Sequence, residues 1–588
     1  MFWKEDDLID VAIGKIAIQS SVCKMSREND ACRAVNPCIY SQKIPYSSCT
    51  AYEFNPWWMI DLELEYKIET ILIYNSSIDP EAIKTLEVYV SSDKKDWQYI
   101  EKDLFIWDRL NSIEITLSQR ISARYVKISL QEKRSLKLKK VQIFIRKYKG
   151  IIIPTRQDGF GARMIATLNA MYLAEKTGFK FGLWWLPKDK KDKYDVFVEK
   201  EEDIFDDIFL KQYSYTNRQI DFIEPIDTID IENISKGYFG EILGYWKANI
   251  INDEKNILGA HDYFERTKKL WDEICFAKKY RKIIQYFKTN DFNEYVGIHI
   301  RNGENVMKYD YRKVIFHDML FDRFFPLELV ENLISRLYQD GKKIVLIGPD
   351  EEVIVKLKNT INKSYGNDFI FLSSDFHATK IENEMEKTFF DLCLLSNLKS
   401  VFCSKSSLYI KLACLIGNCK IERFTDLFSM EEQMDIILKS NLEVNNLHKA
   451  ASFAYVYFAI KDNCNFSYET KNEILDKAFK NDPENYVYII EQVKLALIYD
   501  SISIAEEKLS FCMKQNYNTV MEIIFSKLPS ETKSGYDRQP LAQMNFFNLL
   551  QDLNIENMPY SLGHVLFKFY EYFHKIEKVK EYDKFKIY

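Results

Sequence analysis

The sequence contains no long uninterrupted apolar run. No stretch of its 588 residues reaches the roughly 18 uncharged apolar residues that a membrane-spanning helix requires. The segment from Met1 to Leu8 also lacks an apolar core of signal-peptide length. We therefore expect a cytoplasmic protein.

Positive charge is not in excess. The formal net charge is −6 at neutral pH, so no basic surface dominates the composition. This argues against nucleic acid as the main partner, because nucleic-acid binding depends on Lys and Arg contacts to phosphate. The tail at residues 575–586 is a local basic and aromatic exception. It permits peripheral association with the cytoplasmic face of the inner membrane, and a solvated terminal helix is the alternative.

Paired Cys-x2-Cys motifs are missing as well. The eleven cysteines are an odd number spread over a long chain, which favours free thiols over a disulfide framework. Cys23, Cys32, Cys38 and Cys49 do cluster, but their spacing differs from that of zinc-binding knuckles. We expect ordinary thiols there rather than a zinc site.

The chain is long enough for several domains, and 47% of its residues are hydrophobic. Residues 1–148 contain short β-branched and apolar runs between turn-rich gaps, which predicts an antiparallel β-sandwich. From residue 149 to 430, strands and helices alternate, which predicts two α/β units at 149–292 and 293–430. Residues 431–588 are predicted to be helical, with a loose tetratricopeptide-like repeat. The helical region is either a partner-binding appendage or a cover for the α/β part.

A cluster of polar residues follows one predicted strand, Tyr295 to Ile300. This run is apolar and β-branched, and His299 and Arg301 lie at its carboxyl end, where open α/β sheets bind their ligands. Arg301 can donate two hydrogen bonds to a diphosphate, and His299 can hydrogen-bond a base or ribose. The alternative is an ion-paired arginine beside a buried structural histidine.

Two further segments suggest phosphate-binding geometry. Gly159 and Gly161 predict a tight turn before a helix, so backbone N–H groups beside Arg163 could face an acceptor or a phosphate. Ser406 and Ser407 precede a helix predicted from Leu408 to Ile416, where a diphosphate would meet the positive helix end. A plain strand-to-helix turn and simple helix capping are the respective alternatives.

Three ordered motifs carry a resemblance to a known family. They are the segments His299–Glu304, Asp158–Gly178 and Asp391–Ser407. Together they resemble the fucosyltransferases with a GT-B-like fold, including the bacterial nodulation type and the α1,6 type. The resemblance implies a GT-B core of two Rossmann-like halves, with the acceptor side at 149–292 and the nucleotide-donor side at 293–430.

The resemblance also implies roles for single residues in donor binding. His299 and Asp391 match positions that read guanine, Arg301 matches an arginine on the β-phosphate, and Ser406 or Ser407 matches a phosphate-contacting serine. Asp350 would lie beside the donor as well. The sequence departs from the family at Asn302, where a second basic residue is common, and at Pro349, which precedes Asp350 in place of a threonine.

The expected reaction is displacement at an anomeric carbon. A carboxylate would deprotonate the acceptor hydroxyl while Arg301 stabilises the departing diphosphate. Glu304 is the first candidate for the base and Asp310 the second, and a surface carboxylate is the alternative for both. No Asp-x-Asp motif follows a predicted strand, and the resembled family is metal-independent, so we expect no metal and no cofactor. His317 is a further polar candidate in the next loop.

The amino-terminal segment resembles a discoidin or coagulation-factor type C domain. The residues that carry this resemblance are Ala12–Ser21, Pro56–Leu62, Val90–Trp97 and Arg124–Ile128. The resemblance implies a sandwich that either docks a glycan or only packs against the enzyme. Within it, Trp57, Trp58, Asp61 and Trp97 are expected to be core and scaffold residues.

The combined hypothesis is a bacterial, multidomain glycosyltransferase of the fucosyltransferase-like type. It would transfer a sugar with inversion onto a surface polysaccharide or glycolipid precursor, such as that of capsule or lipopolysaccharide. The first candidate for the sugar is fucose, with GDP-fucose as its donor. One alternative keeps the fold and transfers another sugar or a non-sugar group from a CDP or UDP carrier. The other is a glycan-binding or scaffold protein with a vestigial GT-B core.

Overall fold

The structure is a computed structural model. It describes residues 3–24, 30–36, 47–75, 85–108, 112–218, 224–225, 231–248, 251, 261–316, 321–366, 369–377, 380–404, 407–526, 543–574 and 583–586.

The chain divides into two compact units. Unit 1 consists of Met1–Ile153, Leu173–Gly182 and Gln212–Gly244, and unit 2 consists of Pro154–Tyr172, Leu183–Lys211 and Tyr245–Tyr588. Unit 1 therefore contains the amino-terminal sandwich together with parts of the first predicted α/β region.

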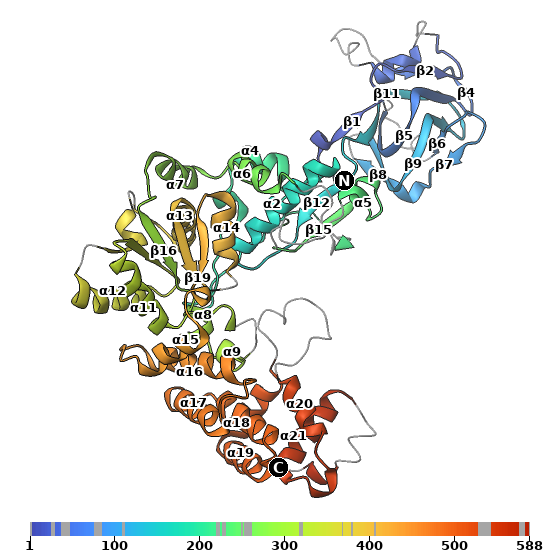
Figure 1. Cartoon of the computed structure of the whole chain (residues 1–588). Helices are drawn as coiled ribbons and strands as arrows, with labels where there is room; N and C mark the ends of the chain where they lie inside the picture. The colour runs from blue at the N-terminus through green and yellow to red at the C-terminus, as the bar shows by residue number, and fades with distance from the viewer. Residues whose placement is uncertain are drawn as a thin grey trace. The chain divides into compact units, whose positions relative to one another are not determined.

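The sandwich in unit 1 is built around two long antiparallel strands, β5 (Trp57–Asn75) and β9 (Ser112–Leu130) (Figure 1). The strand β11 (Lys137–Arg146) pairs with β5, and β6 (Leu86–Ser91) pairs with β9. The register of β5 against β9 shifts twice, which marks bulges where long strands bend. The shorter strands are β1 (Leu8–Asp10), β2 (Ile16–Gln19), β3 (Ser48–Cys49), β4 (Glu53–Phe54), β7 (Gln98–Tyr99), β8 (Phe105–Asp108) and β10 (Lys133–Arg134).

Alternation of side chains along these strands produces the sandwich core. Ile71 and Ile73 of β5 and Ile113 and Ile115 of β9 are all fully buried, as expected for every second residue of a strand. Trp58 is fully buried too, and its Nε1 donates to the carbonyl of Ala31 at 2.9 Å. The antiparallel β-sandwich predicted for the first 148 residues is confirmed.

Unit 1 also contains most of a small parallel sheet in the order β13-β12-β15-β14. Its strands are β12 (Ile151–Pro154), β13 (Lys180–Phe181), β14 (Glu224–Pro225) and β15 (Ile242–Tyr245). A buried ion pair joins Asp7, at the start of the sandwich, to Lys180 of β13, and the hydroxyl of Tyr215 donates to the same carboxylate. Burial lowers the pKa of Lys180, while Asp7 opposes that shift. Unit 1 is therefore held together by a polar contact between its sandwich and its sheet.

Unit 2 contains the second parallel sheet, in the order β18-β17-β16-β19-β20. Its strands are β16 (Tyr295–His299), β17 (Lys343–Ile347), β18 (Ile370–Leu372), β19 (Ser400–Cys403) and β20 (Lys420–Arg423). The chain moves outward from β16 to β18 and then crosses to β19 and β20 on the other side of β16. The α/β region with parallel sheets is thus confirmed, and the crossing creates a topological switch point between β16 and β19.

Helices connect and cover these strands. They are α2 (Phe160–Thr177), α3 (Glu201–Ile204), α4 (Asp207–Tyr213), α5 (Ile231–Lys236), α6 (Tyr263–Glu273), α7 (Lys278–Thr289), α8 (Gly303–Met307), α9 (Tyr309–Arg312), α11 (Leu327–Gln339), α12 (Glu351–Tyr365), α13 (Glu384–Asn397) and α14 (Leu408–Ile416).

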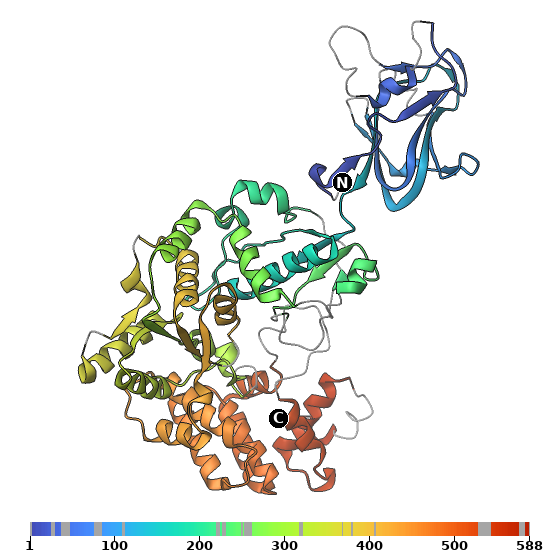
Figure 2. The same ribbon diagram turned by 45° about the horizontal axis from the view of Figure 1, so that its top comes forward.

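The carboxyl-terminal part of unit 2 is helical, as predicted. Consecutive helices from α16 to α19 pack on one another, which Figures 1 and 2 show as a stack. The helices are α15 (Met430–Lys439), α16 (Asn446–Ile460), α17 (Tyr468–Asn481), α18 (Val487–Ile498), α19 (Ile502–Ile524), α20 (Met544–Gln551) and α21 (Tyr560–Tyr572).

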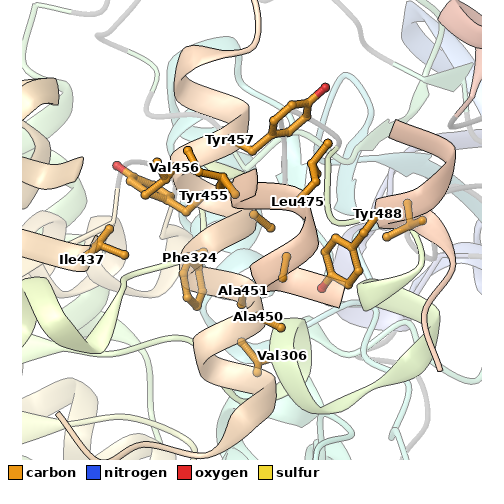
Figure 3. Close-up of a cluster of buried hydrophobic side chains, with 14 of the residues drawn as sticks. Val306, Phe324, Ile437, Ala450, Ala451, Tyr455, Val456, Tyr457, Leu475 and Tyr488 are labelled. Atoms are coloured by element: carbon orange, nitrogen blue, oxygen red, sulfur yellow. The ribbon is translucent and has the colours of Figure 1, made fainter. Parts of the chain in front are cut away.

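One hydrophobic core runs from the second sheet into these helices. Figure 3 shows Val306 of α8 beside Ala450 and Ala451 of α16, with Leu475 of α17 and Tyr488 of α18 in the same cluster. Because the core is continuous, the helical part covers the α/β part, which supports the second of the two roles expected for it. Among the described residues, no helix is both long and apolar enough to cross a membrane.

The Asp7–Lys180 pair provides a stability test. Asp7→Ala should destabilise the protein by roughly 3–5 kcal/mol, because it leaves the ammonium of Lys180 buried without its carboxylate. Denaturant unfolding of the full chain, followed by tryptophan fluorescence, measures the change. Asp6→Ala removes an exposed neighbouring carboxylate and is the control, with an expected effect below about 0.5 kcal/mol. Equal stability of the Asp7→Ala protein and the wild type would contradict a structural role for the pair.

Candidate functional site

The switch point of the second sheet carries two buried polar atoms without partners. His299 ends β16 and Ser404 follows β19, and these strands are hydrogen-bonded neighbours through Ile298 and Phe402. His299 and Ser404 are 4% and 2% exposed. Among the described residues, neither His299 Nδ1 nor Ser404 Oγ has a hydrogen-bond partner. Unsatisfied polar atoms at the carboxyl ends of such strands are what a ligand would satisfy.

His299 is held in its neutral form. Burial, and then the positive charges of Arg301 and Lys387, lowers the pKa of His299 to about 3. Its ring lies 5.7 Å from the ring of Tyr409, the second residue of α14. A neutral imidazole at this place can accept or donate a hydrogen bond, but it does not contribute a positive charge.

Arg301 forms the charged centre of the site. Its Nη2 lies 2.9 Å from Oε1 of Glu304, and the two side chains are 27% and 15% exposed. A second guanidinium, that of Arg323, is close enough to interact electrostatically with both. Burial, and then repulsion by Arg301, lowers the pKa of Arg323. Arg323 also interacts electrostatically with Asp158, which is paired with Arg156. Guanidinium groups of this kind are suited to bind an anion.

Asn302 explains the first departure from the family motif. Its Nδ2 donates to the carbonyl of Phe325 at 2.7 Å, and its Oδ1 accepts from the amide of Phe325 at 3.0 Å. The side chain is 1% exposed. Asn302 therefore joins the end of β16 to the segment around Phe325. Arg323 lies two residues before Phe325, so the same hydrogen bonds help to bring Arg323 near Arg301.

Asp391 lies on α13, near the same sheet edge, and both of its oxygens are engaged. Oδ1 accepts from the hydroxyl of Ser373, and Oδ2 lies 3.1 Å from Nζ of Lys387, which also lies 3.3 Å from Glu351. A hollow of about 730 Å³ is lined by Lys387, Glu351 and His377, among other residues. Lys387 therefore both lines this hollow and contacts the carboxylate of Asp391.

Ser407 and Asp350 are helix caps. Ser407 accepts from the amide of Ile410 at the start of α14, and Asp350 accepts from the amide of Val353 at the start of α12, both at 3.4 Å. Capping accounts for both residues without a ligand, so their contact with a donor stays a prediction. Ser406 and His317 lie outside the described residues.

The structure differs from the predicted glycine turn, because α2 begins at Phe160 and Gly161 is its second residue, whereas Gly159 precedes the helix. Packing explains the glycine at position 161. A Cβ on Gly161 would lie 2.8 Å from Cα of Tyr409, so only glycine permits this approach, whereas Gly159 has more space. Arg163 is 2% exposed and donates to the carbonyls of Asp158, Gln157 and Leu186. Burial lowers the pKa of Arg163 to about 10. Folding accounts for the turn, and its role in acceptor or phosphate binding stays a prediction.

The two candidate bases differ in environment. Asp310 is 70% exposed and pairs with Lys313 at 2.8 Å, which is typical of a surface carboxylate. Glu304 is mostly buried beside Arg301, at the first turn of α8. The geometry therefore favours Glu304 over Asp310 as a group that could face a substrate.

The cysteines include one disulfide, which the sequence did not predict. Cys414 and Cys419 are joined across the turn between α14 and β20, with their Cα atoms 5.0 Å apart. The other described cysteines, including Cys23, Cys32 and Cys49, are free, and Cys38 lies outside the described residues. Within the described ranges, no group of three or more His, Cys, Asp or Glu side chains could hold a metal ion.

Three residues of the site were missed by sequence reasoning. They are Ser404, Arg323 and Lys387, and each is brought to the sheet edge by the fold. Ser404 had a local signal, because it lies within the motif segment Asp391–Ser407 that carried the family resemblance. Lys387 also had a local signal, because it lies four residues before Asp391 on the same face of α13. Arg323 had none, because Arg301 and Glu304 are distant from it in sequence.

The neutral state of His299 makes stability depend on pH. Between pH 7 and 5 the unfolded chain protonates this histidine, whose ordinary pKa is about 6.5, while the folded chain does not. The folded state should therefore lose about 2 kcal/mol as the pH falls over this range. In His299→Asn this part of the pH dependence should disappear, as measured by denaturant unfolding at both pH values. His261→Asn, at an exposed position, should keep the wild-type dependence, and an unchanged dependence in His299→Asn would contradict the buried neutral state.

Comparison with known proteins identifies the sandwich. Residues 43–128 match the family model described as NedA-like, galactose-binding domain, of the F5/F8 type C group. No curated protein matches the chain.

Among solved structures, the lectin domain of lectinolysin complexed with Lewis b antigen is 23% identical, covering 23% of this chain and 96% of that chain with a TM-score of 0.19. The fucose-binding module SpX-3 of Streptococcus pneumoniae is 21% identical. The match covers 24% of this chain and 99% of that chain, with a TM-score of 0.19. The family 32 carbohydrate-binding module of Clostridium perfringens NanJ, in complex with galactose, is 14% identical. The match covers 24% of this chain and 95% of that chain, with a TM-score of 0.18. From the family model and the observed strands, the amino-terminal domain is a discoidin-like β-sandwich of the galactose-binding group.

Proposed function

We propose that the chain is a glycosyltransferase of the fucosyltransferase-like GT-B type. It would use a nucleotide-activated donor, with GDP-fucose as the first candidate, and transfer the sugar with inversion to a bacterial surface polysaccharide or its precursor. The observation that carries the proposal is the pair of unsatisfied buried atoms, His299 Nδ1 and Ser404 Oγ, at the switch point beside Arg301.

The electrostatics of the site support an anionic donor. Arg301 and Arg323 provide two guanidinium groups, and the carboxylates that interact with them are Glu304 and Asp158. A diphosphate placed at the switch point would meet these guanidinium groups and the amino-terminal end of α14, which favours negative charge. The positive charge needed at the leaving group would then come from side chains, so metal-independent transfer is part of the proposal.

The proposed reaction uses Glu304 and Arg301 as partners. In the structure they are paired, and a bound diphosphate would compete for Arg301 and release the carboxylate. Glu304 would then accept the proton of the acceptor hydroxyl as its oxygen forms a bond to the anomeric carbon. The bond from that carbon to the diphosphate oxygen breaks, and the nucleoside diphosphate leaves with the electron pair, stabilised by Arg301.

A different donor nucleotide is the alternative within the same fold. Guanine recognition would require Asp391, and both of its oxygens are occupied by Ser373 and Lys387. If Lys387 moves aside, Asp391 can accept from a guanine N–H; if it does not, a CDP or UDP carrier fits equally well.

Titration calorimetry with GDP, UDP and CDP tests the proposal. GDP should bind most tightly, and Asp391→Ala should remove that preference. Arg301→Ala should weaken all three nucleotides by about 10- to 100-fold, roughly the 1.5–3 kcal/mol of a hydrogen bond to a charged group. Arg336→Ala, on the partly exposed side of α11, is the matched control and should leave the affinities unchanged. Preference for CDP or UDP would reject fucose as the sugar, and no binding of any nucleotide would reject the transferase.

The sandwich favours a second, glycan-binding function. Lectinolysin's lectin domain and the SpX-3 module are described as binding Lewis b and fucose, and a comparable role is proposed for this domain. Tyr52 and Phe54 are 69% and 72% exposed, and Nζ of Lys133 lies 5.9 and 5.1 Å from their ring centres. Two exposed rings beside a cation form a surface on which a sugar can stack.

Glycan-array binding of the full chain tests this second function. The double change Tyr52→Ala and Phe54→Ala should lower binding to fucose- or galactose-terminated glycans by about tenfold or more, because both stacking faces are lost. Ile106→Ala, at another exposed apolar position of the sandwich, should have no effect. Equal binding by the double variant would reject this surface, and no binding by the wild type would favour a purely structural sandwich.

A further inference from the structure

A separate cavity lies one helical turn from Glu304. Its volume is about 380 Å³, and its lining consists of Asp192, Tyr194, Met307, Lys308, Tyr309 and Asp310. Glu304 and Met307 are three residues apart on α8, so the cavity begins roughly 5 Å along the helix from the proposed base. This volume falls in the range of small-ligand sites, which is about 300–1,000 Å³.

Tyr194, one of the lining residues, packs against Gly303 of the His299–Glu304 motif. A Cβ on Gly303 would lie 3.3 Å from Cδ1 of Tyr194 and 3.3 Å from Cγ of Pro349. The ring of Tyr194 therefore packs against the first residue of α8. The position of this ring and the position of Glu304 are set by the same short helix.

Ion pairs hold three further lining residues, Asp192, Lys308 and Asp310. Nζ of Lys308 lies 2.9 Å from Asp192 and also pairs with Asp195, while Asp310 pairs with Lys313 at 2.8 Å. The two pairs of Lys308 join the segment at residues 192–195 to the start of α9, and the Asp310–Lys313 pair lies at α9 itself. The cavity walls are thus preformed rather than dependent on a ligand.

The side chains that line the cavity favour a sugar that carries no acidic group. A tyrosine ring can pack on the C–H face of a sugar, and carboxylates can accept hydrogen bonds from its hydroxyls. Met307 is the single aliphatic side chain in the lining, which is too little apolar surface for a lipid chain. The lining holds two carboxylates, Asp192 and Asp310, but one ammonium, Lys308, so a carboxylate on the ligand would be repelled.

We propose that this cavity, between Tyr194 and the Met307–Asp310 turn, is the acceptor site and takes a neutral or amino sugar rather than an acidic one. The inference rests on the proposed transferase function, because the acceptor hydroxyl must reach Glu304. It adds the substrate class and names Tyr194 and Asp310 as residues that determine acceptor specificity.

Methyl nuclear magnetic resonance of the full chain, labelled at methionine methyl groups, tests the proposal at the site itself. The probes are methyl β-galactoside, methyl β-glucoside and methyl β-glucuronide, each titrated with and without GDP. The Met307 resonance, assigned with Met307→Leu, should shift saturably with the two neutral glycosides, and their affinity should exceed that of the glucuronide by about tenfold. The resonance of Met430, which lies outside the cavity and is partly exposed, is the internal control.

Two variants separate the ring from its hydroxyl. Tyr194→Ala should weaken binding of the neutral glycosides at Met307 by about tenfold, and Tyr194→Phe should stay within about threefold of the wild type, because the ring is kept. Unchanged nucleotide affinity in both variants shows that they are folded.

The outcomes distinguish this inference from the function on which it rests. A Met307 resonance that no glycoside moves, in a protein that binds GDP, overturns the acceptor site and leaves the transferase proposal standing. Loss of nucleotide binding with an intact Met307 response rejects the transferase but retains a sugar site. Glucuronide binding equal to that of the neutral probes overturns the charge selection.

Discussion

The two hydrogen bonds between Asn302 and the backbone of Phe325 hold the segment on which the candidate site of unit 2 depends. This segment leaves β16, carries Glu304 on α8, forms one wall of the cavity and returns with Arg323 beside Arg301. A buried amide that satisfies both a donor and an acceptor is costly to replace, because removal of either partner leaves a buried group unpaired. The two hydrogen bonds therefore fix Asn302, just after β16, against Phe325.

The helices after residue 430 hold the same connection from the other side. Arg312, at the end of α9, pairs with Asp482, and its carbonyl accepts from Asn485 at 3.0 Å. Lys313 reaches Glu522 on α19 at 2.7 Å. Together with the continuous core around Val306, these contacts give the helical part a role in positioning the site. A group that is held on a braced element is displaced less by the binding of its ligand.

Charge is distributed unevenly across the sheet edge of unit 2. His299 stays neutral because it is buried and adjacent to cations. Arg301 and Arg323 both interact with Glu304, and Asp391 is paired with Lys387. The positive side suits a diphosphate, whereas the cavity beyond Glu304 is richer in carboxylates. Such a change of sign over a short distance favours ligands of different charge at the two places.

The local features of this protein were predictable from sequence. The β-branched run at Tyr295 predicted β16, Ser407 and Gly417 bound α14 at the predicted residues, and alternation predicted the sandwich, because each of these signals lies within a few neighbouring residues. The sequence motif also located Arg301 and Glu304 together. The strand order, the approach of Arg323 to Arg301 and the use of Asn302 as a clasp were decided only by the tertiary structure, since they join residues that chain spacing does not relate. Packing and the satisfaction of buried polar groups act over the whole fold, and a linear pattern does not encode which distant groups they bring together.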